Sequence, residues 1–428
     1  MMSLIRSLPG MARDVPAGLI DAGTASLAHF LVGIASVNLL NASDLGVYAV
    51  FFAAFMVSTI VPQFLIFTPA EVAAVSYPLE NRLVQLPQSL RLGVGPTLTG
   101  AAAIAIAAIA TASNTTSDVS VAFACTAGVA VLVSPAQDHV RRLLHIARRS
   151  WSAAAVSVAQ FVVVSAGLGT LILIDVPEEW IPFGALAIAN VASLLLGLIL
   201  ARPGDEAQSE PPLSFRGLVL SGRWLLAMAL IPFGASFLGT LLIVELAGPE
   251  AMGYAEAARV AAQPILVLGT GLSAVLGPRG MEAAIRRNRP AAQKALHVFL
   301  GLILGAGLFY LLVVGHPWIG NPMVYLVPLA YEIQGLVAVT IIAHVITAAA
   351  VQYTSELTGG RKEVELTKMS LIASPFVLVG SATAAATGAF ARAIGMIIEG
   401  SVRYGLYGYA RERMYRDPAD APPPVSVD

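Results

Sequence analysis

Long apolar stretches alternate with short polar or Gly/Pro-containing breaks along the whole chain. A helix needs about 20 residues to cross about 30 Å of hydrocarbon, and twelve of the stretches reach that length. We therefore predict an all-α integral membrane protein with twelve transmembrane helices. Their expected positions are residues 15–39, 45–68, 92–112, 118–138, 151–174, 181–201, 217–246, 250–275, 295–315, 323–350, 367–387 and 390–410.

The distribution of Lys and Arg supports this count, because the cytoplasmic loops of membrane proteins are enriched in basic residues. If the amino terminus is inside, 23 of the 25 Lys and Arg residues fall in cytoplasmic loops or at cytoplasmic helix ends. Outer connections such as LNAS, DVPEEW and LAGPE contain none, and only Arg259 and Arg392 lie toward the outer half. The pattern predicts that both termini are cytoplasmic.

Composition and charge exclude several classes of function. With 57% hydrophobic and 12% charged residues and a mean hydropathy of +0.77, the chain is too apolar for an ordinary water-soluble surface. A formal net charge of -1, with the basic residues scattered among loops, argues against a nucleic-acid partner. No nucleotide-binding glycine loop, HExxH motif or paired cysteine occurs, and the outer connections are too short for a catalytic domain. We expect no enzyme activity, no cofactor and no metal.

A polar stretch in the middle of the chain, ARPGDEAQSEPPLSF, divides the predicted helices six and six. Each half places a Gly and a Tyr after a short outer turn, as NASDLGVYAVFF and AGPEAMGYAEAA show, and Tyr48 and Tyr254 are 206 residues apart. Such turns also suit the membrane interface by themselves. We predict two parallel six-helix lobes, residues 1–201 and 216–410, with a cytoplasmic linker at 202–215 and a disordered cytoplasmic tail at 411–428.

Two segments carry a resemblance to a known family. GLIDAGTASLAHFLVGIASVNLLNASDLGVYAVFF resembles the first two helices of polysaccharide flippases in the multidrug/oligosaccharidyl-lipid/polysaccharide exporter superfamily, and GYAEAARVAAQPILVLGTGLSAVLGPRG is similar to their helix 8. The resemblance implies a MATE-like, V-shaped pair of lobes in the bacterial inner (cytoplasmic) membrane. It also implies that a lipid-(pyro)phosphate-linked oligosaccharide is flipped to the outer leaflet by alternating access, for cell-surface polysaccharide biosynthesis. Membrane lipids and a glycan polymerase or another polysaccharide-assembly protein are the implied partners.

Other functions remain open from the sequence. A cation-coupled multidrug antiporter of the same superfamily would have the same architecture. A twelve-helix facilitator-type transporter of small molecules is a second alternative, although its usual Gly-x-x-x-Asp-Arg loop is missing from SYPLENRLVQLPQSL. A membrane scaffold that transports nothing, or a synthase subunit, is the third.

Charged residues inside the predicted helices are candidate substrate-binding groups, because a charge in the bilayer is costly. Arg259 lies eight residues past Ala251, or about 12 Å along a helix, and Glu256 lies three residues before it on the same face. A guanidinium in a wet cavity suits phosphate oxygens; the alternative is an ion pair that only makes insertion tolerable. Arg403 is a further candidate, and the first half contributes His29.

Three residues are candidates for ion coupling. Glu332 has no basic neighbour on its predicted helix, so it would be protonated, paired elsewhere, or in water near the outer mouth. Glu399 lies four residues before Arg403 and is also suited to a structural pair. His344 has a side chain that titrates near neutral pH, or it serves in packing, as His29 also could.

Asp21 and Arg223 are candidate gating residues. They lie near the inner ends of the first and seventh predicted helices, where related parts of the two halves would meet. They are expected either to pair when the inner side closes or to be solvated separately at the interface.

Overall fold

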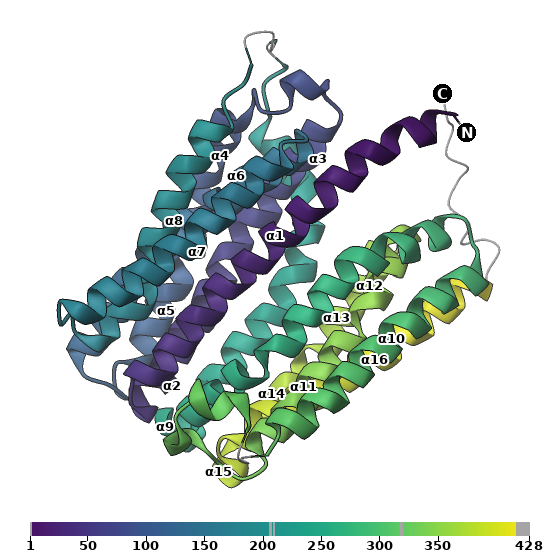
Figure 1. The fold of residues 1–428 in the computed structure, drawn as a ribbon. Coiled ribbons are helices and arrows are strands. Elements are labelled where there is room, and N and C mark those ends of the chain that lie inside the picture. The colour runs from purple at the N-terminus through teal and green to yellow at the C-terminus, as the bar shows by residue number, and fades with distance from the viewer. Residues whose placement is uncertain (1, 205–207, 209, 317–319, 417–428) are drawn as a thin grey trace. The chain divides into compact units, whose positions relative to one another are not determined.

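The computed structural model describes residues 2–204, 208, 210–316 and 320–416. Every regular element in these ranges is helical, and the chain forms two compact units, Met1–Leu230 and Ile231–Asp428 (Figure 1). The boundary between the units falls inside a helix, beyond the expected linker at 202–215.

Unit 1 contains α1 to α8 and the start of α9. Helices α1, α7, α8 and α6 pack against one another in that order, and α2 packs on α4, α5 and α6. The elements are α1 (Met2–Leu39), α2 (Ala42–Pro62), the π-helical turn η1 (Gln63–Phe67), α3 (Thr68–Val75), η2 (Leu79–Asn81), α4 (Leu86–Gly100), α5 (Ala102–Thr111), α6 (Ser117–Ile146), α7 (Ser150–Leu173), η3 (Glu178–Trp180), α8 (Ile181–Leu200) and α9 (Phe215–Ile285).

Unit 2 contains the rest of α9 and the helices that follow, with α16 packed on α11, α12, α13 and α14. The elements are α10 (Arg289–Val314), η4 (Pro322–Tyr325), η5 (Leu329–Tyr331), α11 (Leu336–Ala349), α12 (Val351–Gly359), α13 (Glu363–Ala373), α14 (Pro375–Ser381), α15 (Ala384–Thr387) and α16 (Phe390–Arg416). This arrangement brings the start of α16 beside the middle of α9, although the two segments are far apart in sequence.

The predicted all-helical membrane fold is confirmed. Ten helical stretches of the described residues are long and apolar enough to cross a membrane, so the chain is a multi-pass membrane protein. One of them, Phe215–Ser273, covers two predicted spans, and it is interrupted at Gly248, whose φ of 85° only glycine adopts easily. The predicted span 390–410 does not meet this apolar criterion because α16 carries Arg392, Glu399 and Arg403.

Two predicted boundaries are wrong for identifiable reasons. The helix expected at 323–350 begins only at Leu336, because prolines at 322 and 328 break the preceding stretch and Gly335 has a φ of 81°. The segment expected to be a tail from residue 411 continues α16 to Arg416. In that last part, Arg411 is buried and donates from Nε to Glu356 Oε2 at 2.6 Å. Residues 417–428 of the expected tail lie outside the described residues.

Part of the predicted linker is bound to unit 1. Gln88 donates to the Leu213 carbonyl at 3.1 Å and accepts from the Leu213 N–H at 3.0 Å. Asn81 donates to Glu210 Oε1 at 2.6 Å and accepts from the Gln208 N–H at 2.9 Å. Residue 208 and residues 210–213 therefore lie along the η2–α4 segment.

A close glycine contact joins α14 to α16 and gives a stability prediction. A Cβ added at Gly380 would overlap the backbone of Gly395, whereas a Cβ at the exposed Gly405 on α16 would meet nothing. Gly380→Ala is expected to lower the free energy of unfolding by about 1 to 3 kcal/mol through overpacking. Gly405→Ala should be neutral or raise it by roughly 0.5 to 1 kcal/mol, because alanine favours a helix. Melting temperatures in detergent check this, and an equal or higher melting temperature for Gly380→Ala would contradict the packing described.

Candidate functional site

Glu256 on α9 is the centre of a buried charge cluster in unit 2. Its side chain is 0% exposed. Arg259, one turn further along the helix, donates from Nε to both carboxylate oxygens at 2.9 Å and from Nη2 to Oε1 at 2.6 Å. The predicted pairing of Glu256 with Arg259 is confirmed, and its geometry is the bidentate one that a planar guanidinium favours.

Arg392 on α16 is a second cation in this cluster, which was not assigned to the site from the sequence. Its Nη1 donates to Glu256 Oε2 at 2.6 Å. Two guanidinium groups therefore share one carboxylate, which leaves a formal charge of +1 on the three side chains. The signal was visible in the sequence, because Arg392 and Arg259 were the two basic residues placed toward the outer half.

The two arginines, and not the carboxylate, form the accessible part of this cluster. The side chain of Arg259 is 13% exposed and that of Arg392 is 17% exposed, whereas that of Glu256 is fully buried. Arg259 also donates from Nη1 to Gln263 Oε1 at 3.3 Å. A molecule that reached this cluster would meet positive charge first.

His344 on α11 lies beside the cluster. It is 1% exposed, and its Nδ1 is 3.0 Å from the carbonyl oxygen of Ala262 on α9. Since a carbonyl can only accept, Nδ1 carries the proton, and Nε2 is left as an acceptor with no hydrogen-bond partner among the described residues. This tautomer is compatible with the predicted coupling role of His344, which stays a prediction.

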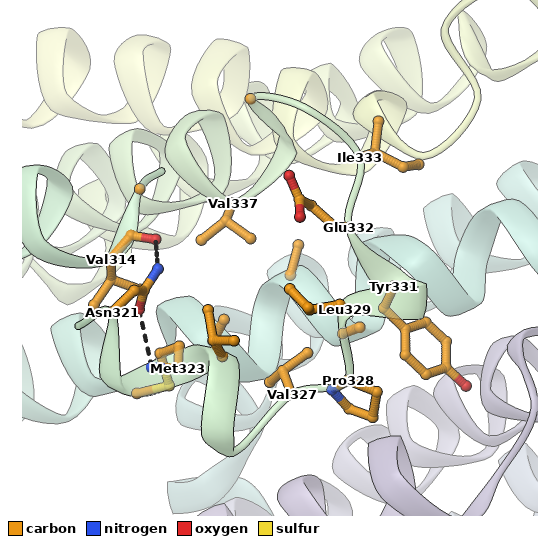
Figure 2. Close-up of a pocket in the computed structure, with 16 residues that line it drawn as sticks. Val314, Asn321, Met323, Val327, Pro328, Leu329, Tyr331, Glu332, Ile333 and Val337 are labelled. Carbon is orange, nitrogen blue, oxygen red and sulfur yellow. Dashed lines mark hydrogen bonds between the residues drawn. The ribbon is translucent and has the colours of Figure 1, made fainter. Parts of the chain in front are cut away.

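Glu332 lies in a loop and not on a helix as expected. It follows η5 and is exposed, at the side of a cavity of about 60 Å³ in unit 2. Figure 2 shows its carboxylate extending toward Val337. Among the described residues that line this cavity, only Glu332 is charged.

The walls of the Glu332 cavity are almost entirely apolar. Ala257, Ala258 and Ala261 contribute the face of α9 that lies away from Glu256 and Arg259. Asn321 orders the opposite wall by donating to the Val314 carbonyl at 3.1 Å and accepting from the Met323 N–H at 2.9 Å, as Figure 2 shows. The middle of α9 therefore separates a cationic cluster from an apolar cavity with one acidic group.

The other candidate residues are dispersed over both units. Glu399 and Arg403 form the expected ion pair on α16. His29 on α1 is half-buried, and its ring Nδ1 is 3.0 Å from the Ala25 carbonyl. Within unit 2, the hydrogen bonds described for Glu256 do not include Glu399 or Arg403. The binding or coupling roles of Glu399, Arg403 and His29 remain predictions.

The expected Asp21–Arg223 pair is not formed in this conformation. Asp21 accepts hydrogen bonds from Ser157 Oγ at 2.5 Å and Arg141 Nη1 at 3.2 Å, and it is 2.9 Å from His145 Nε2. These partners on α6 and α7 satisfy a carboxylate that is only 7% exposed. Arg223 instead lies over the Trp224 ring, 5.7 Å from its centroid. A gate between Asp21 and Arg223 remains a prediction for another conformation.

Among the described residues, no group of three His, Cys, Asp or Glu side chains is arranged to hold a metal ion. The chemistry available at the Glu256 cluster is binding, through charge and hydrogen bonds, at a site that α9 and α16 position together.

Comparison with solved structures identifies the fold. The chain is similar to a multidrug resistance MATE family transporter of the MOP superfamily in its outward-facing conformation, with a TM-score of 0.65, 14% identity and coverage of 95% of this chain and 96% of that chain. For the inward-facing conformation the TM-score is 0.61 at 13% identity, covering 92% and 98%. For the eukaryotic MATE transporter AtDTX14 it is 0.64 at 14% identity, covering 96% and 99%.

No protein-family model and no curated protein matches the sequence. At these identities the likeness establishes the fold alone. The chain is an all-helical, multi-pass membrane protein with the fold of the MATE transporters of the MOP superfamily.

Proposed function

We propose that the chain transports a lipid-(pyro)phosphate-linked oligosaccharide from the inner to the outer leaflet by alternating access. The fold supports transport, because multidrug resistance MATE family transporters that share it have been solved in inward-facing and in outward-facing conformations. The single observation that favours an anionic substrate is the Glu256 cluster, in which two partly exposed arginines share one buried carboxylate. Planar guanidinium groups match the geometry of phosphate oxygens.

The charge balance explains how such a cluster could bind and release its substrate. In the resting state Glu256 compensates one of the two arginines, which reduces the cost of holding them inside a membrane protein. A bound phosphate linkage adds one negative charge to the +1 of the three side chains, and a pyrophosphate linkage adds two. Because the Glu256 carboxylate stays in place, substrate binding brings the net charge of the cluster close to zero. After the substrate is released, the carboxylate still neutralises one of the two arginines.

Transport in liposomes tests the proposal. Wild-type protein is expected to move a fluorescently labelled lipid-pyrophosphate oligosaccharide, and Arg259→Ala should slow that movement roughly tenfold or more, because a hydrogen bond to a charged group is worth about 1.5 to 3 kcal/mol. The matched control is Arg286→Ala, which removes an exposed arginine paired with Glu282 and should change little. An Arg259→Ala protein as active as Arg286→Ala would contradict the proposed role.

The Glu332 cavity favours a second candidate, a cation-coupled multidrug antiporter. A cavity of about 60 Å³ with apolar walls and one carboxylate is suited to a small coupling cation or a proton and not to a phosphate. The same liposomes distinguish the two functions. If the labelled lipid does not move while a cationic dye is exchanged for protons, and if Glu332→Gln abolishes that exchange, the antiporter replaces the flippase.

A further inference from the structure

Three polar side chains in unit 1 form a buried cluster that the proposed binding site does not use. His139 on α6 is 0% exposed, and Ser89 on α4 is 1% exposed. The imidazole Nδ1 is 2.9 Å from Glu71 Oε1 on α3, and its Nε2 is 2.8 Å from Ser89 Oγ. The Phe67 ring, in the π-helical turn η1, stacks on the imidazole with centroids 4.5 Å apart. Every polar atom of the ring is therefore engaged.

The hydrogen bonds of this cluster can be made in two ways that differ by one proton. Ser89 has a single hydroxyl hydrogen, and its Oγ is also 2.9 Å from the Leu86 carbonyl oxygen. If the hydroxyl donates to Leu86, its oxygen can only accept from His139, so Nε2 must carry a hydrogen. Nδ1 then faces the Glu71 carboxylate at 2.9 Å. Two acceptors do not approach so closely without a proton between them, so this arrangement holds one additional proton.

A second arrangement of the same atoms lacks that proton. The Ser89 hydroxyl turns from the Leu86 carbonyl to Nε2, while Nδ1–H donates to an ionised Glu71. The side-chain positions are unchanged, and one hydrogen bond, that to Leu86, is lost. The two arrangements therefore differ by one proton and the rotation of one hydroxyl.

We propose that Glu71, His139 and Ser89 form a binding site for a single proton in unit 1. Proton uptake converts the neutral imidazole into an imidazolium that donates to both Glu71 and Ser89, and it frees the Ser89 hydroxyl to bind the Leu86 carbonyl. No covalent bond forms or breaks other than the N–H bond. A hydrolase-like role for these three residue types is excluded by the burial of Ser89, which leaves no access for a substrate.

The charged groups around the site lead from the buried ring toward an exposed side chain. The charged groups that act on His139 are Glu71 and Arg142, while α4 contributes Ser89 and η1 contributes the Phe67 ring. Arg142 Nη1 lies 3.9 Å from Glu71 Oε2, and its side chain is 44% exposed. Glu71 thus lies between the buried ring and a solvent-exposed cation, at the end of unit 1 that the basic residues predict to be cytoplasmic.

The site also links three helices at an irregular turn. It joins α3, α4 and α6, and the π-helical turn that carries Phe67 connects α2 to α3. Such turns are frequent at functional sites. A role of this site in coupling proton movement to the transport cycle rests on the proposed transport function, whereas proton binding itself does not.

Nitrogen-15 NMR of full-length protein with labelled histidine, in lipid nanodiscs, tests proton binding from about pH 5 to pH 9. The His139 ring is expected to have both nitrogens protonated at low pH and only Nδ1 protonated at high pH. Glu71→Gln removes the facing anion and should move the midpoint to lower pH by about one unit or more. His297→Gln, at an exposed position in unit 2, should leave that midpoint unchanged.

The NMR signal of the His139 ring is the one that is lost in the His139→Gln variant. If that variant does not fold, the signal that moves in Glu71→Gln but not in His297→Gln identifies the ring. A ring that keeps one neutral tautomer over the whole range, or that titrates identically in Glu71→Gln, would overturn the proposal.

Transport assays distinguish a role of this proton site in coupling from the proposed flippase function. In liposomes, Glu71→Gln is expected to flatten the pH dependence of lipid movement, while His297→Gln retains it. If His139 titrates but Glu71→Gln keeps the wild-type pH dependence, coupling at this site is refuted. If wild-type protein moves no labelled lipid while His139 still titrates as expected, the flippase proposal fails and the proton site stands.

Discussion

Glu256→Ala is expected to lower the free energy of unfolding by about 3 to 5 kcal/mol, because it removes a buried carboxylate that pairs with both Arg259 and Arg392. The loss includes the hydrogen bonds from Arg259 and Arg392, and it leaves two like charges close together in a site shielded from water. The melting temperature in detergent, measured with the heat of unfolding, gives the change.

Glu282→Ala is the matched control for this substitution. It makes the same chemical change in an ion pair with Arg286 that is largely exposed on both sides, and such pairs contribute about 0 to 1 kcal/mol. If Glu256→Ala were no less stable than Glu282→Ala, the two arginines would not depend on Glu256, and the cluster would be described wrongly.

Neutralising the whole cluster is expected to reduce movement of a lipid-pyrophosphate substrate roughly a hundredfold. The variant replaces Glu256, Arg259 and Arg392 by glutamine together, so that no charge is left unpaired and hydrogen-bonding groups are retained. Two lost hydrogen bonds from charged donors, each worth about 1.5 to 3 kcal/mol, account for the size of the effect. Initial rates in liposomes, with protein orientation and melting temperature measured for each variant, provide the comparison.

The single variants reveal whether the two arginines act together. Arg392→Gln should slow transport about as much as Arg259→Gln, because each guanidinium group is expected to donate to the phosphate and each contacts Glu256. A fully active Arg392→Gln protein would reduce the site to Arg259 alone.

The sequence was sufficient for features that depend on local spacing. The apolar stretches predicted the helical membrane fold, and the break between the predicted spans 217–246 and 250–275 coincides with Gly248. Glu256 and Arg259 are three residues apart on one helix, so their pairing followed from helix geometry. The same reasoning predicted the pair of Glu399 and Arg403.

Features that depend on tertiary contacts were missed. Arg392 is 136 residues from Glu256 in the chain, and only the packing of α16 against α9 brings them together. Arg411 was assigned to a disordered tail because its neighbours are polar, yet it pairs with the buried Glu356, which is 55 residues away. Arg392 and Arg411 both lower the apolar character of α16, and their partners Glu256 and Glu356 lie on other helices of unit 2.

Glu332 and His139 show two further limits of local reasoning. Hydrophobicity alone extended a helix through Glu332, although prolines and a left-handed glycine place it in a loop. No role was assigned to His139 from the sequence. Its importance appears only when Glu71, 68 residues earlier, and Ser89, 50 residues earlier, are brought to its ring.

The most direct test of phosphate recognition compares two labelled lipids in the same liposomes. Both lipids carry the same saccharide and the same hydrocarbon chain. They differ only in the group that joins the saccharide to the chain, which is a pyrophosphate in one lipid and an uncharged link in the other. For the wild-type protein we expect the pyrophosphate lipid to move at least roughly tenfold faster, and for the triple glutamine variant we expect the two rates to converge. Equal rates in the wild type, or a preference that survives in the variant, would contradict recognition of the phosphate by Arg259 and Arg392.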